Sequence, residues 1–324
     1  AAASERVVCL TWKRPHMTWR GSAVAALIVL GSASFVRSEE PTVADIVSNL
    51  RQAEAVAASL NFCVDLQQES WYRSEDQNDG FRPNRTADVW WEMRADGSRR
   101  CEAVARITSV GEAGERREYT QYELAVFGKP RGLARSATWT MQESGPRQLT
   151  DRSGSSPIGW NYYPLELIGL SQRANVSDLL MKSGAHVIDK TFLDGRAVYI
   201  LQTNPRELNR CSSYQRIWLD AERSTMLRQQ SYSKSSTEHA WHLDRQISYK
   251  QFEHYSNGVL WLPRHVHIWD YYESDAGQHV KHGETHLALG RWQAVAELLD
   301  ERFDVDFESV EGKGGQEPIC LNGS

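Results

Sequence analysis

The stretch VWWEMRADGSRRCEAVARIT, residues 89–108, carries the clearest indication of the fold. The hydrophobic pattern has a period of two residues on both sides of an Asp96-Gly97 pair, from Val89 to Arg94 and from Cys101 to Thr108. An Asp-Gly pair between two such runs is typical of a β-hairpin with a tight turn. We therefore expect this part of the chain to lie in an antiparallel sheet.

The faces of this hairpin do not separate into apolar and polar. A two-residue turn predicts Trp91 opposite Glu102 and Trp90 opposite Ala103. One side of the first strand then carries Val89, Trp91 and Met93, and the other side carries Trp90. Since large apolar residues occupy both sides, something should pack on each face, and two helical segments are available as covers. Which face lies inside stays open.

The same device recurs at two places further along the chain. Asp194-Gly195 separates runs at 187–193 and 197–203, and Asn257-Gly258 separates runs at 246–255 and 259–269. Further strands are predicted at 62–72, 118–128, 134–143, 214–220, 225–233, 279–290 and 303–308. About a dozen strands are more than a flat open sheet usually holds, so the sheet should curl or split.

Two helical segments accompany these strands. Thr42 and Asp45 form a capping box after Pro41, and apolar residues follow at helical spacing, which predicts a helix over 42–59. Residues 152–184 begin with turn formers, continue with an apolar and aromatic run, and end in a short helix over 175–183. We interpret this segment as a lid-like insertion. The predicted fold class is mainly β (α+β): a curved antiparallel sheet or half-barrel covered by an N-terminal helix and a short helical insertion.

Composition restricts the possible partners. Of the 324 residues, 40% are hydrophobic and 24% are charged, which is typical of a soluble globular protein. The formal charge is −5, and residues 1–38 hold five basic and one acidic residue, so the remainder carries −9. This charge does not favour nucleic acid or an anionic membrane as a partner, and we expect peripheral membrane contact at most.

Residues 1–38 read as a leader. A basic segment begins at Met17, an apolar run extends from Ala23 to Leu30, and small residues follow, in the order of a secretory signal peptide. Cleavage could follow Ala33 or Ser38. Residues 1–16 read as an over-extended start. The prediction is an exported protein, periplasmic if the source is a Gram-negative bacterium, with one domain over 39–310 and a flexible tail over 311–324.

Four cysteines follow the leader, namely Cys63, Cys101, Cys211 and Cys320. They could pair in three ways in an oxidising compartment. If the first three strands form a simple meander, the middle strand holds Cys63 and Cys101 too far apart for a disulfide. No C-x-x-C spacing is present, which argues against a zinc cage.

The order of elements resembles the lipoprotein-sorting (LolA-like) family: a signal peptide, one amphipathic helix and a long antiparallel sheet with a helical insertion. Local likenesses lie at Ile46–Leu50 with Leu60–Phe62, at Trp218–Asp220, at Gly258–Pro263 and at Phe303–Phe307. The resemblance implies a curved half-barrel with helices over its concave side, which encloses an apolar cavity for acyl chains. It assigns no individual functional residue.

Histidines are the candidates for a metal site. His265 and His267 lie two apart on one predicted strand, and His282, Glu284 and His286 alternate on the next. A two-residue loop at Ala276-Gly277 would put His267 opposite His286 and Tyr271 opposite His282, whereas a three-residue loop would separate the two sets. Exposed strand histidines without a metal are the favoured interpretation, so no metal and no cofactor is predicted.

Aromatic residues suggest a ligand site, because ten of the 12 tryptophans follow the leader. The insertion is the better candidate for contacts, since core packing is less obligatory there. Its candidate ligand-binding residues are Trp160, Tyr162, Tyr163, Leu165, Leu167 and Ile168. Ordinary packing of these aromatics is the alternative.

No G-x-S-x-G or H-E-x-x-H motif is present, so we predict no catalytic residue and no enzyme. The leading hypothesis is an exported, non-catalytic carrier or binding protein for a lipid or an acylated lipoprotein. One alternative is an envelope sensor or regulatory module that binds a protein partner. A further alternative is a metal-dependent hydrolase.

Overall fold

The computed structural model describes residues 41–73, 82–110, 115–127, 133–140, 148–153, 164, 168–171, 174–208, 211–236, 240–255, 259–273, 279–290 and 292–304. The chain divides into residues 1–40 and 41–324, and every described residue belongs to the second unit. The predicted leader at 1–38 and the predicted tail at 311–324 lie outside the described residues. Within those residues, no helix is both long enough and apolar enough to cross a membrane.

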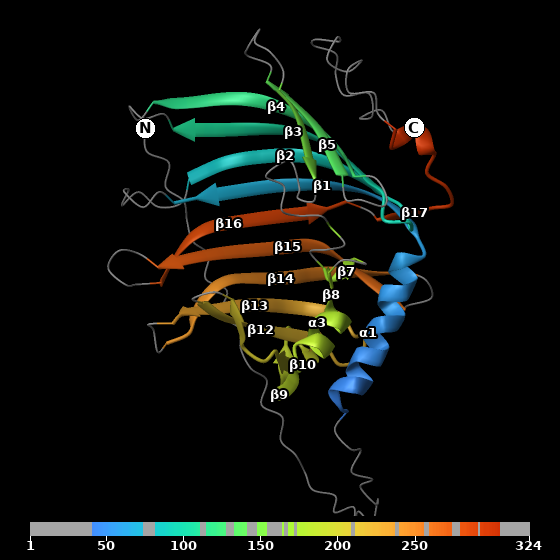
Figure 1. The fold of residues 1–324 in the computed structure, drawn as a ribbon, viewed down its shortest axis with the longest axis vertical. Coiled ribbons are helices and arrows are strands. Elements are labelled where there is room, and N and C mark those ends of the chain that lie inside the picture. Colours follow the sequence, from blue (N-terminus) through green and yellow to red (C-terminus); the bar gives the residue numbers. More distant parts are fainter. Residues whose placement is uncertain are drawn as a thin grey trace, which may run out of the picture. The chain divides into compact units, whose positions relative to one another are not determined.

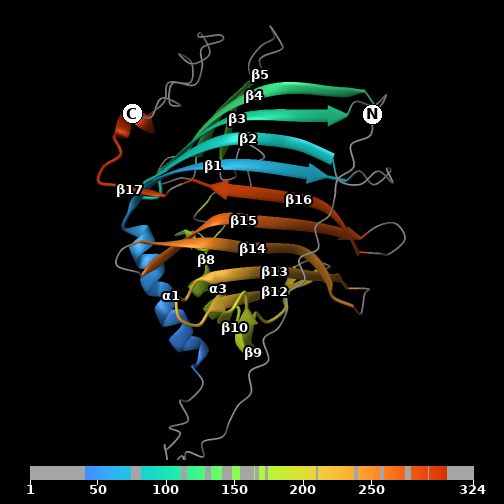
Figure 2. The ribbon, with the colours of Figure 1, turned by 180° about the vertical axis from the view of Figure 1, so that it is seen from behind.

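Most of the described chain forms one large antiparallel sheet (Figures 1 and 2). Its strands are β1 (Asn61–Tyr72), β2 (Arg82–Met93), β3 (Arg99–Val110), β4 (Arg116–Phe127), β5 (Leu133–Thr140), β6 (Gln148–Ser153), β9 (His186–Leu193), β10 (Arg196–Gln202), β11 (Arg206–Leu208), β12 (Cys211–Asp220), β13 (Met226–Ser235), β14 (His242–Tyr255), β15 (Leu260–Glu273), β16 (His279–Leu289) and β17 (Gln293–Val295). The main path runs β6-β5-β4-β3-β2-β1-β16-β15-β14-β13-β12-β10-β9, and β11 and β17 add to β12 and β1. The sheet is curved and open rather than a closed barrel, which confirms the predicted fold class.

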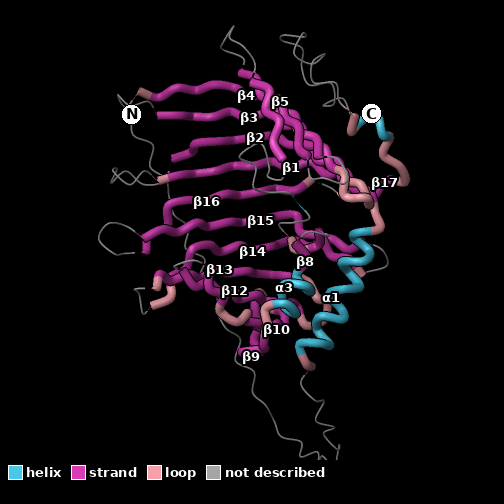
Figure 3. The backbone as a smooth tube through the Cα atoms, viewed as in Figure 1, coloured by secondary structure: helices cyan, strands magenta, loops and turns pink. Residues whose placement is uncertain are grey.

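The helices lie beside one half of the sheet. Helix α1 (Val43–Ala58) begins at Thr42, whose side chain and Asp45 form the predicted capping box. Helix α3 (Val176–Lys182) follows a small ribbon of β7 (Leu170–Ser171) and β8 (Ala174–Asn175). Figure 3 shows both helices next to the half of the sheet that holds β12 to β15.

The first hairpin differs from its prediction by one residue. Trp91 lies opposite Cys101 and Trp90 opposite Glu102, so the predicted partners Glu102 and Ala103 were wrong. The loop holds three residues instead of two, because the Arg94 N–H bonds the Ser98 carbonyl and the Gly97 N–H bonds the Arg94 carbonyl. Gly97 has φ +90°, the left-handed conformation that a three-residue hairpin loop requires at this position.

The strand pairings of the other two hairpins are confirmed. Asp194 and Gly195 have φ of +51° and +78° and form a two-residue turn between Leu193 and Arg196. This is the left-handed pair that a tight hairpin turn needs. Strands β14 and β15 pair from Arg245–Asp270 to Tyr255–Leu260, while the turn at 256–258 lies outside the described residues.

The strand predicted at 303–308 is wrong where it is described. Asp300–Arg302 form a short 3-10 helix, and the N–H of Phe303 closes it by bonding the Asp300 carbonyl. Phe303 is therefore in a helical conformation instead of an extended one, and residues 305–308 lie outside the described part. The short strands β6, β11 and β17 and the β7–β8 ribbon were missed.

The face of Trp91 is the inner one. Trp91 is 2% exposed and shares its face with buried residues of its own strand and of β1, β3 and β16, which are Phe62, Val64, Leu66, Val89, Met93, Ala103, Ala105, Leu287 and Leu289. The opposite face of β1 carries exposed Asp65, Gln67 and Glu69. The hydrophobic core thus lies on one side of the sheet, together with the apolar faces of α1 and α3.

Within the described residues, the outer face of the first hairpin is covered by charged groups around the short 3-10 helix Asp300–Arg302 and not by α1 or α3. Trp90 is half-buried, and its indole N–H donates to Glu92 over 3.2 Å. The guanidinium of Arg302 also binds Glu92, and an Arg100 N–H donates to the Arg302 carbonyl over 2.9 Å. The expectation that the two helical segments would cover both faces is therefore wrong, because the chain around residue 302 provides the second cover.

The positions of the cysteines agree with the predicted meander of the first three strands. Cys63 and Cys101 are buried and free, and β2 lies between their strands, as predicted. Cys211 is exposed and also free, and Cys320 lies outside the described residues.

Candidate functional site

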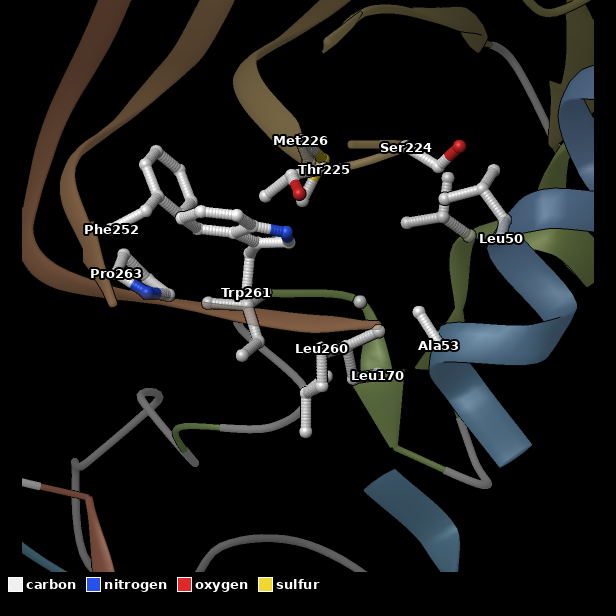
Figure 4. Close-up of a pocket in the computed structure, with 13 residues that line it drawn as sticks. Leu50, Ala53, Leu170, Ser224, Thr225, Met226, Phe252, Leu260, Trp261 and Pro263 are labelled. Atoms are coloured by element: carbon white, nitrogen blue, oxygen red, sulfur yellow. The ribbon is translucent and has the colours of Figure 1, made fainter. Parts of the chain in front are cut away.

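A pocket opens where α1, the segment around residue 170 and the sheet meet (Figure 4). It holds about 400 Å³ of empty space, counting the part that is open to solvent. Its walls are mainly apolar and consist of Leu50, Ala53, Ile168, Gly169, Leu170, Val176, Ser224, Thr225, Met226, Phe252, Leu260, Trp261 and Pro263. Such a lining suits an apolar ligand.

Helix α1 supplies one wall because of its spacing. Leu50 and Ala53 are three residues apart and therefore lie on the same face of the helix. Both are buried, and Ala57 continues this face into the core one turn later. The small side chain of Ala53 leaves space where a larger residue would fill the pocket.

The segment around Gly169 supplies a second wall through a tight turn. Gly169 has φ +71°, and its carbonyl accepts the N–H of Val176 over 3.0 Å. A Cβ atom at Gly169 would overlap the side chain of Val176. This position thus requires glycine both for its conformation and for the close approach of Val176, which sets Ile168 and Leu170 against the pocket.

A buried polar contact fixes α1 to α3 behind these walls. The carboxylate of Glu54 accepts the backbone N–H of Ser177 over 2.8 Å and also accepts the Ser177 hydroxyl. Ser177 lies in the first turn of α3, where backbone N–H groups lack partners within the helix. Burial raises the pKa of Glu54 above its ordinary value, and the two bonds from Ser177 lower it in part.

The sheet supplies the third wall. Figure 4 shows the indole of Trp261 beside Phe252, with Leu50 and Ala53 facing the pocket from α1. The guanidinium of Arg223 lies 3.9 Å from the centroid of the Trp261 ring, a cation–π contact. Trp261 is half-buried, so part of its side chain remains accessible.

Of the predicted ligand-binding residues, Ile168 lines the pocket and is 7% exposed. Trp160, Tyr162, Tyr163, Leu165 and Leu167 lie outside the described residues. Ala53, Met226, Phe252 and Trp261 also line the pocket but were not among the predicted ligand-binding residues. Their strand or helix periodicity is that of ordinary core residues, and only the tertiary fold brings them together.

The histidines divide into three places. His267 lies opposite His286, as the shorter of the two predicted loops requires. Tyr271 pairs with Lys281 and not with His282, because a bulge follows Asp270 and inserts one extra residue in β16. The ring of His282 contacts Tyr72 and Tyr272, while His265 is exposed opposite Ala288.

One buried carboxylate lies in the sheet away from the pocket. Glu123 is 2% exposed and accepts two bonds from one Arg85 nitrogen, over 3.0 and 3.2 Å, and one from Gln121 over 2.9 Å. Burial raises the pKa of Glu123 to about 7, although Arg85 acts in the opposite direction. The carboxyl thus titrates near neutral pH.

No protein-family model and no curated protein matches the sequence. Among solved structures, the chain is similar to an outer membrane lipoprotein-sorting protein domain from Vibrio parahaemolyticus, at 10% identity and a TM-score of 0.47, over 84% of this chain and 100% of that one. It is also similar to a DUF1329 family protein from Desulfovibrio piger, at 12% identity and a TM-score of 0.44, over 81% and 97% of the two chains. A LolA superfamily protein from Nitrosomonas europaea matches at 14% identity and a TM-score of 0.40, over 83% and 100%.

Proposed function

We propose that the protein is an exported, non-catalytic carrier or binding protein that holds an acyl chain of a lipid or lipoprotein in the pocket between α1, α3 and the sheet. The observation that supports this is the lining itself: ten of its 13 residues are apolar and only Gly169, Ser224 and Thr225 are not. The predicted signal peptide supports export, and the periplasm would be its destination in a Gram-negative bacterium.

The energetics favour an apolar occupant. Each Å² of apolar surface removed from water contributes about 25 cal/mol, so an acyl chain gains by entering and the exposed part of Trp261 gains by being covered. The residues around the pocket form three walls, from α1, from residues 168–176 and from the sheet, so a ligand would contact all three at once. Affinity should therefore depend on how α1 and the insertion are held against the sheet.

The test compares one substitution at two positions of the same helix. Ala53 faces the pocket and Ala55 is exposed. We expect Ala53→Phe to weaken the binding of a fluorescent fatty acid at least tenfold, because the ring fills the pocket, and Ala55→Phe to change it less than twofold. Thermal unfolding of both variants shows whether the fold is intact, and Ala53→Leu serves as a milder replacement should the phenyl ring destabilise α1.

The identity of the natural ligand needs a separate measurement. Mass spectrometry of organic extracts from natively purified protein should recover an acyl-containing molecule from the wild type and less of it from Ala53→Phe. Failure of the wild type to bind fatty acid and to release any lipid would refute the proposal and favour the alternative of a protein partner.

A further inference from the structure

We propose that His267, Glu284 and His286 bind a divalent transition-metal ion, with zinc the best fit to the donor set, on the outer face of the sheet. This site is independent of the apolar pocket. Strands β15 and β16 carry it, and its residues share the face that points away from buried Val266 and Leu287.

The register brings the three side chains together. His267 lies directly opposite His286, and Glu284 precedes His286 by two residues and so projects from the same face. Nε2 of His267 is 2.6 Å from Oε1 of Glu284, and Nε2 of His286 is 2.9 Å from the same oxygen. Two imidazoles on neighbouring strands therefore already point their Nε2 atoms at one carboxylate oxygen.

The spacing is close to what a metal needs. The three ligand atoms lie within 4.8 Å of one another. Zinc bonds nitrogen and carboxylate oxygen at about 2.0–2.2 Å, so tetrahedral ligand atoms are about 3.3 Å apart. The longest separation must shorten by at most about 1.5 Å, which rotation of the exposed His286 ring can supply.

The surroundings restrict the rings without filling the fourth position. The ring of Trp269 lies 3.7 Å from that of His267, and the ring of Trp71 lies 4.8 Å from that of His286. These contacts limit how far either imidazole can turn away. His286 is exposed, so water can take the remaining coordination position.

Lys281 interacts directly with the carboxylate of Glu284. Its ammonium binds Oε2 of Glu284, so Oε1 is the oxygen that remains for the metal. The positive charge should lower metal affinity through repulsion while it keeps the carboxylate oriented. Replacement of Lys281 by methionine is therefore expected to strengthen metal binding, an effect that a purely structural ion pair would not produce.

The chain offers a matched control in His265. This histidine is exposed on the same face of β15, two residues from His267, and has Ala288 opposite it. Untagged protein would be titrated with Zn²⁺ against a chromophoric chelator, with bound metal counted by elemental analysis. We expect one Zn²⁺ per chain, at least tenfold weaker binding in His267→Gln, in His286→Gln and in Glu284→Gln, and unchanged binding in His265→Gln.

Three results of the zinc titration would contradict the proposed metal site. No zinc bound to the wild type, undiminished binding in His267→Gln and His286→Gln, or an equal loss in His265→Gln would overturn the proposal. Because the three residues lie on the surface of the sheet, unfolding by urea should show the same midpoint for the variants as for the wild type without metal. Fatty-acid binding by His267→Gln should equal that of the wild type, so failure here is distinguishable from failure of the proposed carrier function.

Discussion

The inner face of the sheet has an apolar end and a polar end. Where β1 begins, next to α1, the face holds Phe62, Val64 and Leu66, with Leu289 opposite Leu66. Four residues further along β1 the face becomes polar, and Ser70 lies opposite Thr285. The apolar end is buried and the polar end is buried or half-buried, and different interactions stabilise them.

Hydrogen bonds replace apolar contacts at the polar end. Gln68 donates to Ser70 over 2.9 Å, and the hydroxyls of Ser70 and Thr285 lie 3.1 Å apart. Arg85 of β2 and Glu123 of β4 add an ion pair on the same face, across the intervening strand β3. Apolar burial hardly depends on pH, whereas a buried ion pair does, so the two ends should respond to different perturbations.

The largest expected effect is at the apolar end. Trp91→Ala removes a side chain that is 2% exposed and whose ring lies 6.5 Å from that of Phe127. We expect a loss of about 3–5 kcal/mol in the free energy of unfolding, equally at pH 5 and pH 8. Urea unfolding measures it, and Trp90→Ala on the outer face, expected to cost about 1 kcal/mol, is the control. Equal losses would contradict the assignment of the inner face.

The contribution of the polar end to stability should depend on pH. The pKa of Glu123 is about 7 in the folded protein against an ordinary value of 4.5. A raised pKa means that the folded state binds the proton more tightly, so this contribution is complete below pH 4.5 and is lost as the pH rises through 7. It amounts to about 3 kcal/mol, from the two and a half pKa units involved.

The test compares the free energy of unfolding of the wild type with that of Glu123→Gln at each pH. The difference is needed because other groups titrate in the same pH range. Burial lowers the pKa of His267, so the contribution of this group to stability changes with pH in the opposite direction to that of Glu123, whereas Glu54 adds to the slope of Glu123. Urea unfolding at intervals from pH 4.5 to 8 should show the wild type losing stability relative to Glu123→Gln. Parallel curves would show that Glu123 is ionised throughout.

The parts of the fold that local chemistry determines could be predicted from the sequence. The capping box at Thr42, the left-handed pair Asp194-Gly195 and the period of two all act within a few residues. The register of the first hairpin was wrong by one because Asp96-Gly97 fits a loop of two residues and also one of three. Trp90 and Trp91 are both large and apolar, so the inner face could not be chosen before the covers were known.

The candidate sites depend on contacts between segments that are distant in the sequence. For this reason fewer of their residues could be predicted. Ala53 and Trp261 line the same pocket only because α1 packs against β15, and nothing in the sequence near either residue indicates it. The pairing of His267 with His286 was one of two open registers, and the bulge after Asp270 that separates His282 from them has no sequence signal of its own.

A glycine-to-alanine substitution is expected to destabilise the turn at the pocket more than an equivalent turn at an exposed position. Gly169 and Gly195 both have left-handed φ angles, but a Cβ atom meets Val176 at the first position and nothing within 4 Å at the second. We expect Gly169→Ala to cost about 2–3 kcal/mol and Gly195→Ala about 1 kcal/mol in urea unfolding. Only Gly169→Ala should weaken fatty-acid binding. Similar costs and similar binding would mean that the insertion does not depend on this close approach.

The smallest effect concerns the contact behind the pocket, where a polar group is buried at the apolar end. Ser177→Ala removes the hydroxyl that donates to Glu54 and leaves the backbone bond of Ser177 in place. Loss of one such bond to a buried carboxyl should cost about 1–2 kcal/mol. Ser183→Ala at the other end of α3 is the control, because the Ser183 hydroxyl makes only a 3.4 Å bond to the Leu180 carbonyl at a half-buried position.

The cost of Ser177→Ala should also depend on pH. Since Glu54 keeps fewer bonds to its charged form in Ser177→Ala, its pKa should rise further, and the cost should be greater at pH 8 than at pH 4.5. A cost that is independent of pH would show that Ser177 stabilises α3 by packing alone and that the carboxylate of Glu54 does not hold the two helices together.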